Sequence, residues 1–169
     1  MSRRLEIVGP VGEHAVGKTA QIAALPVRRI EDGTLQVLLI TSRETRRWVI
    51  PKGWPMKGLK DHKAAAREAE EEAGLVGRMR KEPIGSYAYF KRRNDHFDLC
   101  EVTVYLLKVE SQKKQWREKN QRQCRWFSLE DAADRVDEPG LTKLILGAGQ
   151  YVGGEDTERL LPESAPRQN

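Results

Sequence analysis

Three glutamates at helical spacing are the residues of this sequence best suited to chemistry. They lie in the stretch REAEEEAGL, residues 67–75, as Glu68, Glu71 and Glu72. Positions i, i+3 and i+4 share one face of an α-helix, so the three carboxylates would converge there. Gly74 predicts the helix end, where the macrodipole and mutual repulsion both disfavour negative charge. A hard divalent cation such as Mg²⁺ or Mn²⁺ would relieve that repulsion, because these ions prefer oxygen ligands.

The same spacing has a plainer interpretation, a solvated acidic helix face, but the preceding sequence favours a metal site. The segment WVIPKGW, residues 48–54, is an apolar strand-like run interrupted by Pro51 and Gly53. A loop with three lysines follows, and then an alanine-rich segment with a helical pattern. Strand, glycine loop and acidic helix together form a recognisable unit.

This unit resembles the signature of the Nudix hydrolases, G-x5-E-x7-R-E-U-x-E-E-x-G-U, in which U is a bulky aliphatic residue. The positions in register are Gly53, Arg67, Glu68, Glu71, Glu72, Gly74 and Leu75. The sequence departs from the pattern at Ala69, which keeps a small apolar residue for the core, and at Leu59, which replaces the first glutamate. That glutamate usually supports the loop and helix, and Asp61 could take over part of this work as N-cap.

The resemblance implies an α/β fold, namely a Nudix-type α/β/α sandwich with a mixed β-sheet, and hydrolysis of a diphosphate bond. Glu68 and Glu72 are then the first choices as direct metal ligands, with Glu71 as a ligand or water-orienting base. The Gly53 carbonyl adds a further ligand by analogy with the family, and Arg67 orients a glutamate. The expected cofactor is Mg²⁺, with Mn²⁺ as the alternative, which would draw charge from the phosphoryl oxygens and lower the pKa of a bound water.

One glutamate of the signature segment takes no part in the cluster, and the identity of the general base stays open. Glu70 points away from the other glutamates by helical geometry. Family members often take their general base from a loop outside the signature. Glu101 and Glu118 are both candidates here, and the sequence does not choose between them.

The Pro-Lys-Gly sequence at residues 51–53 resembles dinucleoside polyphosphate hydrolases and some diphosphoinositol polyphosphate phosphohydrolases. The wider segment, residues 37–53, resembles the latter group especially. In that group a Ser and an Arg at the turn matching Ser42 and Arg43 contact substrate phosphates. Lys52, next to Gly53, adds a point charge that can hold a phosphate. Arg47 belongs to the same basic cluster as Arg43. We therefore expect these four residues to bind substrate, although an exposed turn is the plainer interpretation.

The preferred function is hydrolysis of diphosphoinositol polyphosphates. The alternative within the enzymes is a hydrolase of dinucleoside polyphosphates or other nucleoside diphosphate derivatives, for which Tyr87, Tyr89 or Phe90 could stack a base. A different class is a non-catalytic Nudix-like module that binds a phosphorylated ligand. The intact glutamates of the signature argue against that class.

A second motif offers an alternative phosphate-binding site. GEHAVGKT, residues 12–19, matches the P-loop pattern literally, with Lys18 and Thr19 in the roles of counter-charge and magnesium ligand. The segment after it soon reaches Pro26, which leaves little room for the required helix, and no aliphatic run ending in Asp follows. We therefore interpret residues 1–18 as an entry segment.

Length, hydropathy and charge limit the possible domain organisation, localisation and partners. A chain of 169 residues suits one domain with a core, which we assign to residues 19–152, followed by a polar tail at 153–169 that we expect to be mobile. The sequence has no apolar run of transmembrane length, no secretory leader and two unpatterned cysteines, so we expect a cytoplasmic protein without a membrane partner. A net charge of +5 without a nucleic-acid-binding signature favours a small polyphosphorylated partner over nucleic acid.

Apolar runs and turn signals predict the elements of this domain. The expected strands cover residues 21–30, 36–41, 47–50, 84–91, 97–109 and 124–127. The expected helices cover residues 61–73, 128–135 (capped by Ser128) and 141–151. Residues 111–122 are almost wholly polar and are expected to form a loop. Strands interleaved with helices indicate an α/β domain.

Overall fold

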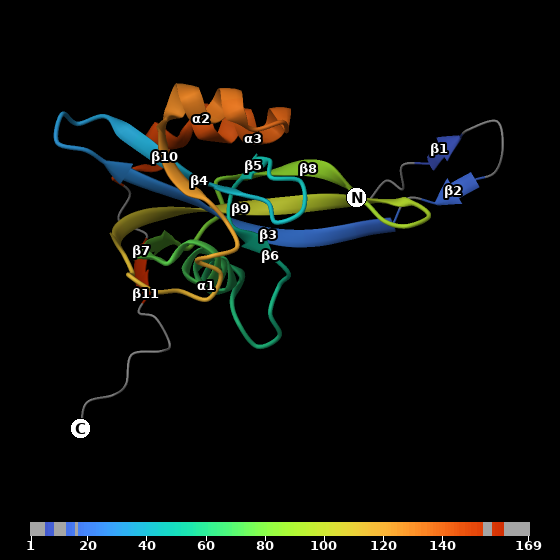
Figure 1. The fold of residues 1–169 in the computed structure, drawn as a ribbon, viewed down its shortest axis with the longest axis horizontal. Helices are drawn as coiled ribbons and strands as arrows, with labels where there is room; N and C mark the ends of the chain where they lie inside the picture. The colour runs from blue at the N-terminus through green and yellow to red at the C-terminus, as the bar shows by residue number, and fades with distance from the viewer. Residues whose placement is uncertain (1–5, 9–12, 16, 154–156, 161–169) are drawn as a thin grey trace.

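The fold is given by a computed structural model (Figure 1), which describes residues 6–8, 13–15, 17–153 and 157–160, with side chains for residues 17–153. The strands are β1 (Glu6–Val8), β2 (Glu13–Ala15), β3 (Gly17–Arg29), β4 (Leu35–Thr41), β5 (Trp48–Val49), β6 (Lys52–Gly53), β7 (Leu75–Arg80), β8 (Gly85–Arg92), β9 (Phe97–Gln112), β10 (Cys124–Ser128) and β11 (Thr157–Leu160). The helices are α1 (Asp61–Ala73), α2 (Leu129–Arg135) and α3 (Pro139–Leu146), followed by the 3₁₀ turn η1 (Ala148–Tyr151).

A mixed sheet forms the middle layer of the domain. Its order is β10-β4-β3-β9-β7-β11, with β5 paired to β4, β6 to β3 and β8 to β9. β3 and β9 run parallel over their length, whereas their other neighbours pair antiparallel. Figure 1 shows α1 on one face of the sheet and α2 and α3 on the other. The expected α/β/α sandwich with a mixed sheet is therefore confirmed.

Alternating residues of the central strands supply two cores, one on each face. Ile22 and Ala24 of β3 pack with the apolar cluster beneath α1, while Ala23 and Leu25 belong to the cluster beneath α2 and α3. Successive side chains of a strand point to opposite faces, so a strand covered on both sides is apolar throughout. This explains the unbroken apolar run in β3, and it fixes α1 firmly against the sheet.

Helix α1 has the bounds that the sequence predicts, but its start is capped differently. Gly74 ends it in the left-handed region, at φ 69°, and its N–H bonds back to the Glu70 carbonyl at 2.8 Å. Lys60 is the N-cap residue and makes no side-chain capping bond, so the expectation that Asp61 is the N-cap is wrong. Asp61 is instead the first helical residue, where its charge still complements the helix dipole.

Three other features differ from the sequence-based expectation. The strand β7 was not predicted, because it is short and its apolar residues are interrupted by Gly77, Arg78 and Arg80. The segment expected to be helical at 141–151 breaks at Gly147 into α3 and η1. Within the tail at 153–169, β11 pairs antiparallel with β7, and residues 154–156 and 161–169 lie outside the described part.

The P-loop interpretation is not supported by its structural context. Lys18 and Thr19 lie inside β3, paired with Leu99 and Cys100 of β9, rather than at the start of a helix. Gly12 and Val16 of the motif, and most of the entry segment at 1–18, lie outside the described residues. Among the residues that the structure describes, no helix combines the length and apolarity needed to cross a membrane.

Candidate active site

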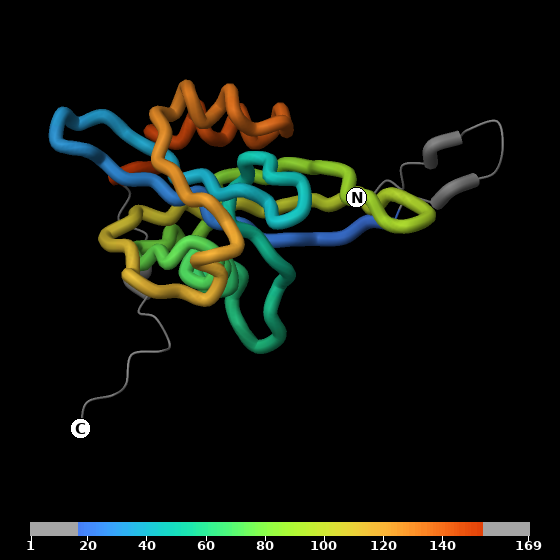
Figure 2. Tube along the Cα trace, viewed as in Figure 1, coloured from blue at the N-terminus to red at the C-terminus, as the bar shows by residue number. Residues whose placement is uncertain are grey.

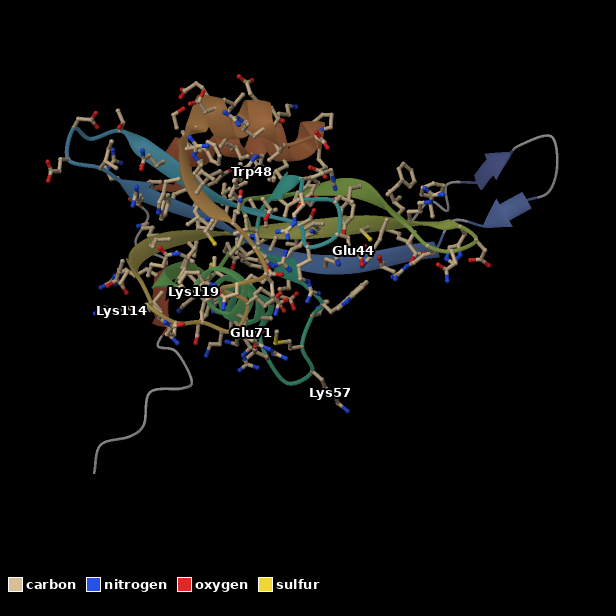
Figure 3. All side chains as sticks on the ribbon, in the orientation of Figure 1. Glu44, Trp48, Lys57, Glu71, Lys114 and Lys119 are labelled. Atoms are coloured by element: carbon tan, nitrogen blue, oxygen red, sulfur yellow. The ribbon has the colours of Figure 1, made fainter. Side chains whose placement is uncertain are left out.

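A pocket of about 480 Å³ opens beside the acidic face of α1. Carboxylates and cations both line it, and Figure 3 shows Glu71 on the α1 side of the sheet. The acidic members, called the carboxylate cluster below, are Glu68, Glu71, Glu72 and Glu118. The cationic members are Arg43, Lys52, Lys91, Arg117 and Arg122. The pocket therefore combines the signature glutamates with a cationic surface suited to phosphate.

Glu72 is the most buried member of the carboxylate cluster, at 6% exposure. Its Oε2 accepts from the Lys52 backbone N–H at 3.0 Å, and its Oε1 accepts from Arg122 Nη2 at 3.1 Å. Burial raises the pKa of Glu72 to about 8; Arg122 opposes the rise, and Glu68 and Glu118 add to it. The side chain is thus fixed between β6 and Arg122 in surroundings that disfavour its charge.

Glu68 lies directly against the backbone of β6. A Cβ atom added at Gly53 would collide with the Glu68 carboxylate, so the signature glycine provides room for this acid. Burial raises the pKa of Glu68 to about 7, and the nearby charges of Glu71 and Glu118 contribute further. The glycine and the first glutamate of the helix are therefore in contact, as the predicted metal-ligand roles require.

The remaining signature residues lie around this centre. Glu71 Oε1 is 3.5 Å from Arg117 Nη1 at the pocket wall. Glu70 turns away, as helical geometry predicts, and its carboxylate is 2.6 Å from Lys113 Nζ. Arg67 donates to Met56 Sδ at 3.6 Å and does not line this pocket, so its role in orienting a glutamate stays a prediction.

Leu59, at the first glutamate position of the signature, is partly buried and packs against the apolar cluster beneath α1. Its neighbour Met56 packs against the same cluster, and the Leu59 N–H bonds to the Met56 carbonyl at 3.1 Å. Apolar packing and a backbone turn thus support the loop before α1, at the position where the Nudix signature has a glutamate.

The structure separates the four residues expected to bind phosphate. Lys52 and Arg43 line the pocket, whereas Ser42 and Arg47 do not. The Lys52 ammonium lies 5.3 Å from the Tyr89 ring centroid, and burial lowers the pKa of Lys52. Two phosphate-binding candidates are therefore placed at the carboxylate cluster, and the roles of the other two stay predictions.

Ser42 and Arg47 have local partners instead. The Ser42 hydroxyl contacts Thr45 and accepts from the Arg47 N–H at 3.1 Å, which closes the turn. The Arg47 guanidinium lies 2.9 Å from Asp137 Oδ2 and 3.1 Å from Glu138 Oε1, at the connection between α2 and α3. Both side chains thus stabilise the turn and its contact with the helical layer.

The segment between β9 and β10, residues 113–123 (called the β9–β10 loop), supplies pocket residues that the sequence did not single out. Figure 2 shows it passing beside α1 on its way to β10. It contributes Arg117, Gln121 and Arg122 to the wall, together with Glu118. Their signal in the sequence was a dense run of charge, but an irregular segment has no period that would indicate which side chains face the site.

The two candidate bases are now distinguished by location. Glu118 belongs to the carboxylate cluster, where Arg122 Nη2 lies 3.2 Å and Arg43 Nη1 3.6 Å from its Oε1. Glu101 lies outside the pocket wall and pairs with Lys18 at 3.3 Å. Glu118 is therefore the candidate that is close to the signature residues.

The donor set fits a hard divalent cation. Carboxylate oxygens are the ligands that Mg²⁺ and Mn²⁺ prefer, and the pocket brings four carboxylates together. Across the described side chains, no three acidic, histidine or cysteine groups are already gathered closely enough to enclose an ion. Glu72 and Glu71 are instead bonded to arginines of the β9–β10 loop.

Comparison with known proteins identifies the family of the chain. The NUDIX domain family matches residues 19–145. The chain is 30% identical over 140 residues to diphosphoinositol polyphosphate phosphohydrolase 3-alpha of Mus musculus, covering 78% of this chain and 81% of that protein. It is 32% identical over 108 residues to Nudix hydrolase 4 of Arabidopsis thaliana, covering 64% of this chain and 51% of that protein, so it spans about half the length of this plant relative.

A solved structure shows the same fold. The Ap4A hydrolase of C. elegans superposes with a TM-score of 0.56 at 19% identity, covering 80% of this chain and 98% of that one. Nudix hydrolases cleave phosphoanhydride bonds and generally use divalent cations such as Mg²⁺. Because the family match runs from β3 into α3 and includes the glutamate signature, the chain belongs to the Nudix family.

Proposed function

We propose that this protein is a Mg²⁺-dependent hydrolase of a phosphoanhydride bond in a small polyphosphorylated molecule, with diphosphoinositol polyphosphates as the preferred substrate class. The observation that carries the proposal is the pocket itself: the carboxylate cluster and five cationic side chains share one space of about 480 Å³. A diphosphate needs both, since its bridging bond is flanked by phosphoryl groups that must be bound and neutralised.

Each pocket residue has a separate role in the proposed reaction. Glu68 and Glu72 would hold the cation, with Glu71 beside them, and the cation would supply Lewis-acid chemistry by withdrawing charge from the phosphoryl oxygens. Lys52 and Arg43 would bind neighbouring phosphates, which fixes the reacting phosphorus relative to the attacking water. Glu118 would accept the proton of that water, since it is the pocket carboxylate supplied from outside α1.

The cationic wall favours an inositol polyphosphate. Such a molecule carries many phosphates and no aromatic base, so affinity must come from charge. Arg43, Lys52, Lys91 and Arg117 supply it from separate segments around the pocket. The similarity to the mouse diphosphoinositol polyphosphate phosphohydrolase, which extends over most of both chains, supports the same substrate class.

One observation favours a second candidate, a dinucleoside polyphosphate. Trp54 directly follows β6, lines the pocket and is 45% exposed, so its indole face is available to stack a base. Of the other aromatics considered for this role, Tyr89 lines the pocket with its hydroxyl 2.6 Å from Gln21 Oε1. Tyr87 is buried in the core and Phe90 lies outside the pocket wall.

The test is a phosphate-release screen with Mg²⁺ over inositol pyrophosphates, dinucleoside polyphosphates, nucleotide sugars and ADP-ribose. We expect turnover of inositol pyrophosphates at the highest kcat/KM, unchanged within about threefold in Trp54→Ala. Highest turnover of a dinucleoside polyphosphate, with KM raised about tenfold in Trp54→Ala by the lost stacking, would favour the second candidate. No turnover of any diphosphate with Mg²⁺ or Mn²⁺ would leave only a phosphate-binding module.

A further inference from the structure

Arg122 occupies a central position that the signature does not explain. Its side chain is 9% exposed, beside the Glu72 and Glu118 side chains at 8% and 14%. Its Nη2 lies 3.1 Å from Glu72 Oε1 and 3.2 Å from Glu118 Oε1, and its Nη1 donates to the Thr41 carbonyl at 3.2 Å. One buried guanidinium therefore joins α1, β4 and the β9–β10 loop.

The bond to Glu72 uses an oxygen that a cation would also need. The other oxygen of Glu72 already accepts from the Lys52 N–H. Both carboxylate oxygens are therefore engaged, and no ready-made cage of three acidic groups exists among the described side chains. A buried carboxylate is costly without a counter-charge, and the guanidinium fork supplies one to two acids at once.

We propose that Arg122 is the internal counter-ion of the carboxylate cluster, and that a divalent cation must compete with it for Glu72. The inference rests on the proposed metal-dependent function. Arg122 is then a positioning residue: it keeps Glu72 and Glu118 in place before the cation binds, and its positive charge lowers the affinity of the site for the cation.

The experiment measures Mn²⁺ dissociation constants of the full chain by electron paramagnetic resonance of free Mn²⁺, together with melting of the metal-free protein. Arg122→Gln should bind Mn²⁺ roughly tenfold more tightly, because one positive charge next to a divalent ion is removed. The same variant should melt lower without metal, since two buried carboxylates lose their partner. Arg122→Lys keeps the charge and should bind within about threefold of the native protein.

Arg78→Gln is the matched control. Arg78 is also paired with a glutamate, at 3.7 Å from Glu110 Oε1, but it lies on β7 outside the pocket. Its loss should leave Mn²⁺ affinity unchanged, which separates a local competition from the change in net charge. Equal or weaker Mn²⁺ binding by Arg122→Gln would overturn the proposal and make Arg122 a simple scaffold for the ligands.

A measurement on the native protein covers the case in which Arg122→Gln does not fold. The Arg122 Nη2–H resonance, which reports the bond to Glu72 and is assigned with Arg122→Lys, should shift and exchange faster with solvent as Mg²⁺ is added. A resonance that does not respond while Mg²⁺ binds overturns the inference but leaves the proposed function intact. If the native protein binds neither Mg²⁺ nor Mn²⁺ at millimolar concentration, the proposed function fails together with it.

Discussion

The two sides of the pocket are built in opposite ways. On one side, α1 presents the signature glutamates from a regular helix that is held against the sheet by fully buried alanines such as Ala69. On the other side, the β9–β10 loop consists of turns and bends, and carries both arginines and an acid into the same space. Helical geometry places the first set, whereas hydrogen bonds between the two sides place the second.

Those hydrogen bonds come from the end of α1. The last carbonyls of a helix have no partner within it, and here the loop and the last residue of β9 provide partners. The Glu118 N–H bonds to the Glu71 carbonyl at 3.0 Å, and the Lys113 N–H bonds to the Gly74 carbonyl at 2.8 Å. The Gln112 side chain donates to the Ala73 carbonyl at 2.9 Å. The acidic helix thus anchors the loop that supplies its cations, and each side depends on the other.

The largest expected effect is on the helical side. Glu72→Gln removes a carboxylate that we propose as a metal ligand and should lower kcat by at least about a hundredfold, the scale of losing one preorganised electrostatic group in a site. Phosphate release with Mg²⁺, beside circular dichroism for folding, measures it. Glu70→Gln, one position away from Glu71 but paired with Lys113, is the control and should stay within about threefold. Similar losses in both would mean that the whole acidic run acts only through its charge.

On the loop side, Glu118→Gln tests whether an irregular segment can supply a catalytic group. We expect kcat to fall by roughly a hundredfold and the acidic limb of the pH–rate profile to disappear, as loss of a general base requires. Glu101→Gln, whose carboxylate pairs with Lys18 outside the pocket, should change neither. A Glu118→Gln enzyme with native kcat and pH profile would assign the base to Glu71 on α1.

This contrast also explains what the sequence could predict. The bounds of α1 and its stop at Gly74 follow from local spacing and from one residue that tolerates positive φ, so they were predicted correctly. Arg122 was missed because its place depends on how the loop docks on Glu71, which no local pattern encodes. Arg47 was grouped with Arg43 by proximity in sequence, yet the turn directs its side chain to the helical layer instead.

A smaller effect tests the coupling between the two sides. Gly74→Ala places a Cβ at φ 69° and into the indole of Trp116 in the loop, so it should lower the free energy of unfolding by about 2–3 kcal/mol and also reduce kcat. Gly58→Ala is a matched control, because Gly58 has φ 78° with open space around its Cβ position. It should cost about 1 kcal/mol from backbone strain alone, without a change in kcat. Equal costs, measured by urea unfolding, would show that Trp116 docking contributes nothing.

The smallest expected effect is the pH dependence of stability, and it should come from the helical side. The pKa values of Glu68 and Glu72 rise from 4.5 in the unfolded chain to about 7 and about 8, so the folded protein binds more protons between these limits. Stability without metal must therefore fall as the pH increases from about 4.5 to 8. Relaxation of the site and entry of water around the ionised carboxylates limit the loss to about 1–2 kcal/mol, or roughly 2–8 °C in Tm.

Melting curves of the metal-free protein at pH 5 and pH 8 measure this fall, and two substitutions on α1 should respond differently. Glu72→Gln carries no charge at either pH, so it should reduce the slope, whereas Glu70→Gln should keep the native slope. Mg²⁺ should raise Tm at pH 8 much more than at pH 5, because protons compete with the cation for the same oxygens. An unchanged slope in Glu72→Gln would assign the pH dependence to Glu68 on the same helix, and Glu68→Gln should then reduce it.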